Sequence, residues 1–114
     1  MKLQDILGIL NGQVICGEKR LNEEVDTGFA SDLLSDVLTL QTNNLILLTG
    51  LANVQTIRTA EMADIHYIIL VRKKKATAEM IEMAIENNQV IIECTYSMFR
   101  AAGMLFNAGL KAIY

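Results

Sequence analysis

The side chains with the clearest capacity for chemistry form one basic run, Arg72, Lys73, Lys74 and Lys75. This run directly follows an apolar stretch at 67–71, and Thr77 just beyond it is a typical helix N-cap. Cations beside the free N–H groups of a helix N-terminus can hold a phosphate or a carboxylate. The alternative is a solvated turn that balances an acidic surface, and the residues alone leave both interpretations open.

The geometry of the basic run limits how many of its side chains reach one ligand. Successive side chains of an extended segment point to opposite sides. We therefore predict that at most two of the four reach a common site, with Arg72 and Lys74 or Lys73 and Lys75 as equally plausible pairs.

A second polar turn, with the hydroxyl residues Thr95, Tyr96 and Ser97, follows the apolar stretch at 90–92. Hydroxyls at this position normally cap the following helix, and a capped helix still has free N–H groups for a ligand. The turn therefore predicts a helix cap, a ligand contact or both.

A third polar turn follows the apolar stretch at 45–48 and contains Gly50 and Asn53. Gly50 either permits a ligand to approach the backbone closely or serves only the turn, and Asn53 is placed to cap a helix. The pattern GxxxxGK[ST] is absent, so this turn is not a P-loop.

The remaining reactive residue types show no catalytic or metal-binding spacing. His66 is the only histidine, and no serine or cysteine stands in a nucleophile motif with it. Cys16 and Cys94 lie far apart without a CxxC partner, which predicts two buried thiols. The acidic residues show no spacing that a divalent cation requires. We therefore predict no enzyme activity, no metal and no cofactor.

Three successive units of strand, polar turn and helix position these groups. The apolar runs that start at 45, 67 and 90 predict strands, and the residues after each turn predict helices that start at Asn53, Thr77 and Ser97 and end near 62, 87 and 107. Such repetition predicts a largely parallel sheet with helices on its faces. It also places the three polar turns together at the carboxyl edge of the sheet, where open α/β sheets bind ligands.

The rest of the chain predicts shorter elements around this sheet. We expect a helix over the first ten residues, a strand at 13–17, a charged turn at 18–24 and an extended segment at 25–30, which together suggest a non-parallel lobe. Ser31 is expected to cap a helix at 32–40 that ends at 41–44, and 110–114 can return as a short strand. The inward face of the helix at 32–40 is predicted to be Leu33, Leu34, Val37 and Leu38.

Length and composition bound the class of protein. The chain of 114 residues, with 52% hydrophobic and 20% charged side chains, predicts one folded domain over 1–114. No apolar run approaches the roughly 20 residues of a membrane span, and the start does not resemble a signal peptide. A net charge of -3 argues against nucleic-acid binding. We expect a cytoplasmic protein without membrane or nucleic-acid partners.

The stretches 45–50, 63–71 and 90–102 together resemble the DRTGG domain family, and the resemblance covers almost the whole chain. The chain also resembles, more remotely, the amino-terminal domain of HPr kinase/phosphorylase. The resemblance implies a three-layer α/β/α domain with a largely parallel central sheet. In that family the domain accompanies phosphotransacetylases and CBS-containing regulatory pyrophosphatases, which implies a regulatory role without catalysis of its own.

The chain departs from the family at the motif that names it. The Asp-Arg pair of the motif is replaced after Gly50 by Leu51 and Ala52, and the Thr-Gly-Gly is replaced by the start of the basic run. The fold is therefore expected to carry over, whereas ligand contacts made by the motif are not. Some standalone relatives are linked to iron-only hydrogenase systems, but two distant cysteines do not supply the four thiolates of an iron-sulfur cluster.

These observations predict a non-catalytic regulatory or interaction module that forms a homodimer, because a small chain with surplus apolar surface commonly buries it in a twofold assembly. A protein partner in a regulatory or redox-linked system is the further partner that the resemblance suggests. The alternative function is a sensor that binds an anionic ligand, a nucleotide or a phosphorylated metabolite, at the carboxyl edge of the sheet. Its tentative site consists of Gly50, Asn53, Arg72, Lys73, Lys74, Lys75, Thr95, Tyr96 and Ser97.

Overall fold

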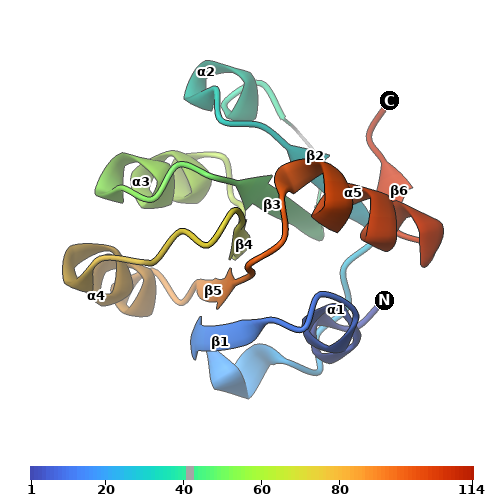
Figure 1. The fold of residues 1–114 in the computed structure, drawn as a ribbon. Coiled ribbons are helices and arrows are strands. Elements are labelled where there is room, and N and C mark those ends of the chain that lie inside the picture. The colour runs from blue at the N-terminus through green and yellow to red at the C-terminus, as the bar shows by residue number, and fades with distance from the viewer. Residues whose placement is uncertain (41–42) are drawn as a thin grey trace.

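The computed structural model describes residues 1–40 and 43–114, and within them a six-stranded sheet with the order β1-β5-β4-β3-β2-β6 (Figure 1). The strands are β1 (Gln13–Cys16), β2 (Thr27–Ala30), β3 (Leu45–Thr49), β4 (Tyr67–Leu70), β5 (Val90–Glu93) and β6 (Lys111–Ala112). Only β1 runs antiparallel to its neighbour β5, and the other four pairs are parallel.

Helices cover both faces of this sheet, which confirms the predicted three-layer α/β/α fold. The helices are α1 (Leu3–Ile9), α2 (Leu34–Val37), α3 (Val54–Met62), α4 (Ala78–Glu86) and α5 (Met98–Asn107), and a short 3-10 helix, η1, spans Glu18–Arg20. Figure 1 shows α1 and α5 on one face of the sheet and α2, α3 and α4 on the other.

The three central strands are apolar on both sides because each face packs under its own helices. In β3, Ile46 and Leu48 join the core beneath α1 and α5, whereas Leu45 and Leu47 join the core beneath α2, α3 and α4. The same alternation continues in β4 and β5. Strands buried on both faces read as continuous apolar runs, which is why the sequence made them recognisable.

The three major helices begin at the predicted N-caps. The side-chain oxygens of Asn53, Thr77 and Ser97 each accept a hydrogen bond from the backbone N–H three residues later, at 3.1 Å in every case. Each cap satisfies one of the N–H groups that a helix start leaves without a partner. The predicted bounds of these helices agree with the structure because short polar caps interrupt otherwise regular apolar patterns.

The predicted non-parallel lobe is correct for β1 and wrong for β2. Strand β2 pairs parallel with β3, where Thr27 lies opposite Leu45, and also parallel with β6, where Thr27 lies opposite Lys111. The chain returns to the sheet edge after α5 and so places β6 outside β2. The direction of a strand depends on the side from which the chain enters the sheet, which local sequence does not encode.

The predicted helix at 32–40 is wrong in its length and its cap. Only α2 is helical there, Leu33 and Leu38 are 58% and 48% exposed, and Ser31 accepts a hydrogen bond from the Leu33 N–H outside the helix. The reason is Asp32, whose carboxylate binds the end of β3 and so holds the chain out of helical conformation. The predicted stop of this helix includes Gln41 and Thr42, which lie outside the described residues.

Candidate functional site at the carboxyl edge of the sheet

The polar turns after β3, β4 and β5 meet at one edge of the sheet, as the sequence predicts. Thr49 lies opposite Leu70, and Leu70 lies opposite Glu93, so the three strands end in one row. The next residues of each turn therefore share the same edge. This arrangement brings the basic run beside the hydroxyl turn at 95–97.

The backbone of the basic run is left-handed rather than extended at its first two residues. Arg72 and Lys73 have φ angles of 61° and 63°, and their N–H groups donate to the carbonyls of Tyr96 and Cys94 at 2.8 and 3.2 Å. These hydrogen bonds join the turn after β4 to the turn after β5. The predicted alternation of side chains along 72–75 is therefore wrong, because alternation requires extended backbone.

Arg72 is separated from the lysines and pairs with Asp32 at 3.4 Å. Its guanidinium lies against Gly50, where a Cβ would stand 2.6 Å from Nε and 2.8 Å from Cζ of the arginine. Asp32 also accepts hydrogen bonds from the Thr49 hydroxyl at 3.0 Å and the Gly50 N–H at 2.6 Å. The group that approaches Gly50 closely is thus an arginine of the chain itself.

The three lysines line a small hollow of about 90 Å³, which we call the lysine hollow. Its lining residues are Asn11, Gln13, Lys73, Lys74, Lys75, Glu93, Cys94 and Thr95. The carboxylate of Glu93 accepts a hydrogen bond from Lys75 Nζ at 3.2 Å and one from the Ala76 N–H at 2.8 Å. Glu93 therefore holds Lys75 in place and closes one side of the hollow.

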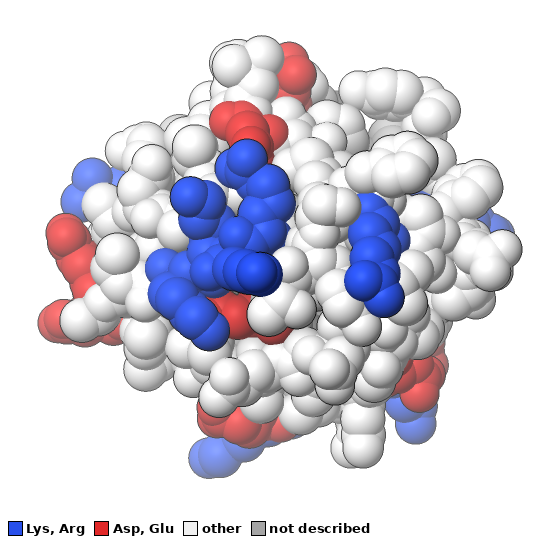
Figure 2. All heavy atoms as spheres, in the orientation of Figure 1, with Lys and Arg blue, Asp and Glu red and all other residues white. Residues whose placement is uncertain are grey.

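The charge of the lysine hollow is positive. Three lysines against one glutamate leave a formal charge of +2, and neither Lys73 nor Lys74 has an ion-pair partner within residues 1–40 and 43–114. Figure 2 shows basic side chains gathered over the part of the molecule where Figure 1 places the ends of β4 and β5. The hollow is therefore able to attract an anion.

The other predicted site residues have different positions and roles. Asn53 and Ser97 cap α3 and α5 with their side chains. Tyr96 lies beneath Arg100, whose Cζ is 3.8 Å from the ring centroid, whereas Thr95 is exposed and lines the lysine hollow. The structure thus brings Thr95 and the three lysines together, and it places Gly50 and Arg72 in a separate group with Asp32.

Sequence reasoning missed Glu93 and Asp32. Glu93 is 8% exposed at the end of an otherwise apolar strand, and this isolated charge was a usable signal, because buried acids need partners. Asp32 carried no comparable signal. Only the position of β2 beside β3 brings it to the Thr49 hydroxyl.

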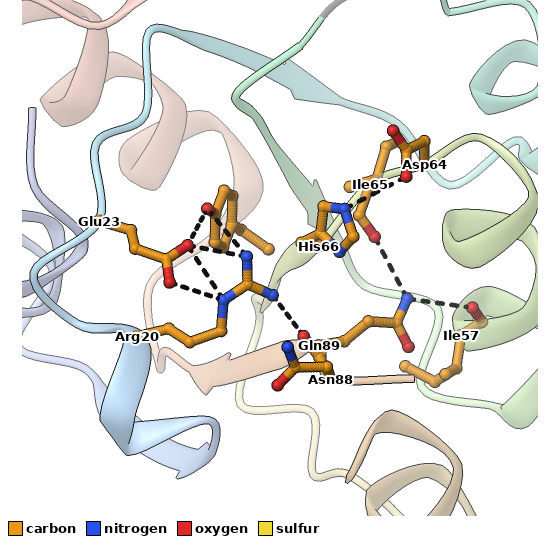
Figure 3. A network of polar contacts seen from close by, with 9 residues as sticks. Arg20, Glu23, Ile57, Asp64, Ile65, His66, Asn88 and Gln89 are labelled. Carbon is orange, nitrogen blue, oxygen red and sulfur yellow. Dashed lines mark hydrogen bonds and ion pairs between the residues drawn. The ribbon is translucent and has the colours of Figure 1, made fainter. Parts of the chain in front are cut away.

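A second polar cluster lies at the opposite, amino edge of the sheet and is drawn in Figure 3. Arg20 donates to the Glu23 carboxylate from Nε and Nη2 at 2.7–3.0 Å, and it also donates to the Asn88 carbonyl. The Tyr67 hydroxyl donates to Glu23 at 2.6 Å. We call Arg20, Glu23 and Tyr67 the amino-edge clamp, because they tie η1 and the following turn to the starts of β4 and β5.

The amino-edge clamp shifts the ionisation of its members. Burial, with the hydrogen bond to Glu23, raises the pKa of Tyr67 to about 12. The hydrogen bond from Arg20 lowers the pKa of Glu23 from its ordinary value. Both shifts favour the forms that already bond to each other, so the clamp is a completed structural network.

The neighbouring polar residues of Figure 3 also have structural partners. His66 lies 3.2 Å from the Asp64 carboxylate, and the buried Gln89 donates to the carbonyls of Ile57 and Ile65 at 3.4 and 3.2 Å. Gln89 thereby bonds one carbonyl of α3 and one carbonyl of the turn between α3 and β4. These contacts stabilise the turn.

Both cysteines are buried free thiols, as predicted. Burial raises the pKa of Cys16 and of Cys94, which keeps both thiols protonated and weakly nucleophilic.

Among the described residues no cluster of three or more His, Cys, Asp or Glu side chains is arranged to hold a metal ion. Every helix in the described parts of the chain is too short or too polar to cross a bilayer.

Comparison with known proteins supports the fold. Sequence comparison finds no match among protein-family profiles or among curated proteins. The structure is similar to the crystal structure of the CBS and DRTGG domains of the regulatory region of Clostridium perfringens pyrophosphatase, complexed with its activator diadenosine tetraphosphate. The TM-score is 0.73 at 16% sequence identity.

The alignment covers 91% of this chain and 45% of the pyrophosphatase chain, so this chain spans less than half of that neighbour. The likeness confirms the predicted DRTGG-like fold, a compact α/β domain with a mostly parallel sheet between helices. The neighbour is a regulatory region of an enzyme.

Proposed function

We propose that residues 1–114 act as one non-catalytic regulatory module that binds an anionic ligand, a nucleotide or a phosphorylated metabolite, in the lysine hollow. The observation that carries this proposal is the pair Lys73 and Lys74, which line a hollow of formal charge +2 without an ion-pair partner in the described parts of the chain. Unpaired ammonium groups around a concave surface attract anions.

The size of the hollow indicates which part of a ligand it takes. Its volume of about 90 Å³ is well below the roughly 300–1,000 Å³ of sites that enclose a drug-sized ligand. A single phosphate or carboxylate group therefore fits the hollow, and the remainder of the ligand lies over the neighbouring surface. Thr95 supplies a hydroxyl at the rim for a further hydrogen bond.

The nucleotide in the structural neighbour supports polyphosphates as the first ligands to test. The pyrophosphatase regulatory region was crystallised with diadenosine tetraphosphate as its activator. This chain lacks the Asp-Arg and Thr-Gly-Gly of the family motif, so we propose that it binds its anion through the lysines instead.

The absence of a paired nucleophile and base within the described residues supports a role without catalysis. His66 lies at the amino edge with Asp64, whereas the hydroxyls of Thr95 and Ser97 lie at the carboxyl edge. Nucleophilic catalysis needs these groups within hydrogen-bond reach of one another. Arg72, a further charged residue at the carboxyl edge, forms an ion pair with Asp32.

The proposal is tested by thermal shift with inorganic phosphate, pyrophosphate, ATP and diadenosine tetraphosphate. A ligand at 100 times its Kd stabilises the folded state by about 2.7 kcal/mol. We expect at least one of these anions to raise the Tm of the wild type and to lose most of this effect with Lys73→Ala/Lys74→Ala.

The matched control is Lys19→Ala/Arg58→Ala, which removes two exposed charges that lie outside the lysine hollow. It should retain the full shift. Equal, salt-sensitive losses in both double variants would identify a diffuse basic surface and refute the site. No shift with any of the four anions at millimolar concentration would refute it as well.

We also propose that the module is a homodimer and works in the cytoplasm with a protein partner in a regulatory system. Seven large apolar side chains are at least 48% exposed among the described residues, which supports an unfilled interface. The two buried free thiols are compatible with a reducing compartment. Light scattering at low micromolar concentration tests the dimer, and the mass of a single chain would refute it.

A further inference from the structure

An apolar groove of about 350 Å³ lies between α5 and the strands β2 and β6, away from the lysine hollow. We call it the α5 groove. Buried Leu48 and Leu105 contribute to its lining, and Phe99 and Phe106 also line it. Figure 1 shows α5 and β6 together at the side of the molecule where the chain ends.

Phe99 and Phe106 are not covered by the described parts of the chain. They are 90% and 68% exposed, and their spacing of seven residues places them on one face of α5 with Ala102 and Gly103 between them. The helix packs on the sheet through Ala101 and Leu105 and leaves the two rings outside.

Gly103 stands in the middle of α5, where a glycine costs about 0.5–1 kcal/mol relative to alanine. A Cβ built at Gly103 meets nothing within 4 Å among the described residues, so no contact with them requires the glycine. A helix surface without a side chain lets another helix approach closely. Gly103 therefore leaves room for a second backbone to pack over this face.

We propose that the α5 groove is the surface on which a second copy of this chain packs, with the two α5 helices crossing at Gly103 and the phenylalanines of each copy entering the groove of the other. This inference rests on the proposed homodimer and names its interface. Such a contact is self-complementary, because the same patch supplies both the protruding rings and the groove that receives them.

The available aromatic surface is sufficient for a dimer. Phe99, Phe106 and Tyr114, which is 92% exposed two residues beyond the groove-lining Ala112, offer about 500 Å² per copy at about 150–250 Å² for a whole aromatic side chain. Two copies that cover all three rings fully then remove about 1,000 Å² from water, which reaches the lower limit of about 1,000 Å² for a specific interface. A small apolar ligand inside the groove would leave the outer faces of both rings in water.

The sharpest test is Gly103→Leu, compared with the wild type by light scattering and sedimentation from 1 to 200 µM. A side chain at position 103 has open space in the single chain, so the variant should fold, as circular dichroism will verify. We expect it to raise the dimer dissociation constant at least about tenfold. Phe99→Ser/Phe106→Ser should have the same effect.

The matched control is Met62→Ser/Ile85→Ser, which removes two apolar side chains of similar exposure from α3 and α4. It should remain dimeric. A wild-type dimer that persists in both α5 variants would refute this interface and leave the proposed homodimer intact. A monomeric wild type would refute the homodimer itself, and binding of an apolar fluorescent probe that is lost in the Phe99→Ser/Phe106→Ser variant would then assign the groove to a small ligand.

Discussion

At the amino edge of the sheet, Arg20, Glu23 and Tyr67 satisfy one another, whereas at the carboxyl edge Lys73 and Lys74 face a hollow without an ion-pair partner in the described residues. Both edges carry cations beside an acid. The two edges differ in the ratio of positive to negative side chains and in whether the cations line a hollow. Charges that match within the chain serve stability, and surplus charge around a hollow remains available to a ligand.

The amino-edge clamp should give the larger stability effect when it is broken. Arg20→Met removes the donors to Glu23 and to the Asn88 carbonyl, together with the cation that lies over the Tyr67 ring. Hydrogen bonds to charged groups contribute about 1.5–3 kcal/mol each, so we expect a loss of about 3 kcal/mol in the free energy of unfolding. Urea denaturation measures it, and a loss below 0.5 kcal/mol would show that the clamp is not structural.

The same clamp predicts a fall in stability at high pH. The pKa of Tyr67 is raised to about 12 in the folded protein, whereas an unfolded tyrosine titrates near 10. Between these values the unfolded state binds fewer protons than the folded state, so the free energy of unfolding decreases as the pH rises, by up to about 2.7 kcal/mol. Tyr67→Phe should lack this decrease, and parallel pH profiles of the two proteins would contradict the assignment.

The carboxyl edge also contains a structural acid, Asp32, whose removal sharpens the comparison. Asp32→Ala removes the acceptor for the buried Thr49 hydroxyl and for the Gly50 N–H. A buried donor without a partner costs about 1–3 kcal/mol, and we expect a loss of about 1.5 kcal/mol. Thermal and urea unfolding measure this loss. An unchanged stability would mean that water replaces the carboxylate at both donors.

The lysines of the hollow should give the smallest stability effect. Lys73 and Lys74 are exposed and unpaired in the described structure, so Lys73→Ala/Lys74→Ala should change the free energy of unfolding by no more than about 0.5 kcal/mol. The same variant is expected to lose anion binding. A large loss of stability would show that these lysines have a structural role like that of the clamp residues, and it would contradict the contrast between the two edges.

Much of the fold was predictable because the signals are local. The apolar runs of β3, β4 and β5 and the caps Asn53, Thr77 and Ser97 are visible in the sequence, and the structure confirms each of them. The candidate site was predictable only as a set of turns at one edge. The structure separates Arg72 from the three lysines through the left-handed backbone of Arg72 and Lys73. Neither arginine nor lysine is a residue type that predicts this backbone conformation.

The sequence by itself determined the three-layer fold and the edge at which the polar turns meet, because strand and helix periodicity follow from side chains a few positions apart. Only the tertiary structure decided that β2 runs parallel beside β3, that Asp32 takes Arg72 away from the lysines, and that Glu93 holds Lys75. The physical reason is distance along the chain. These partners lie 18 or more positions apart, and their pairing depends on how the strands are ordered in the sheet.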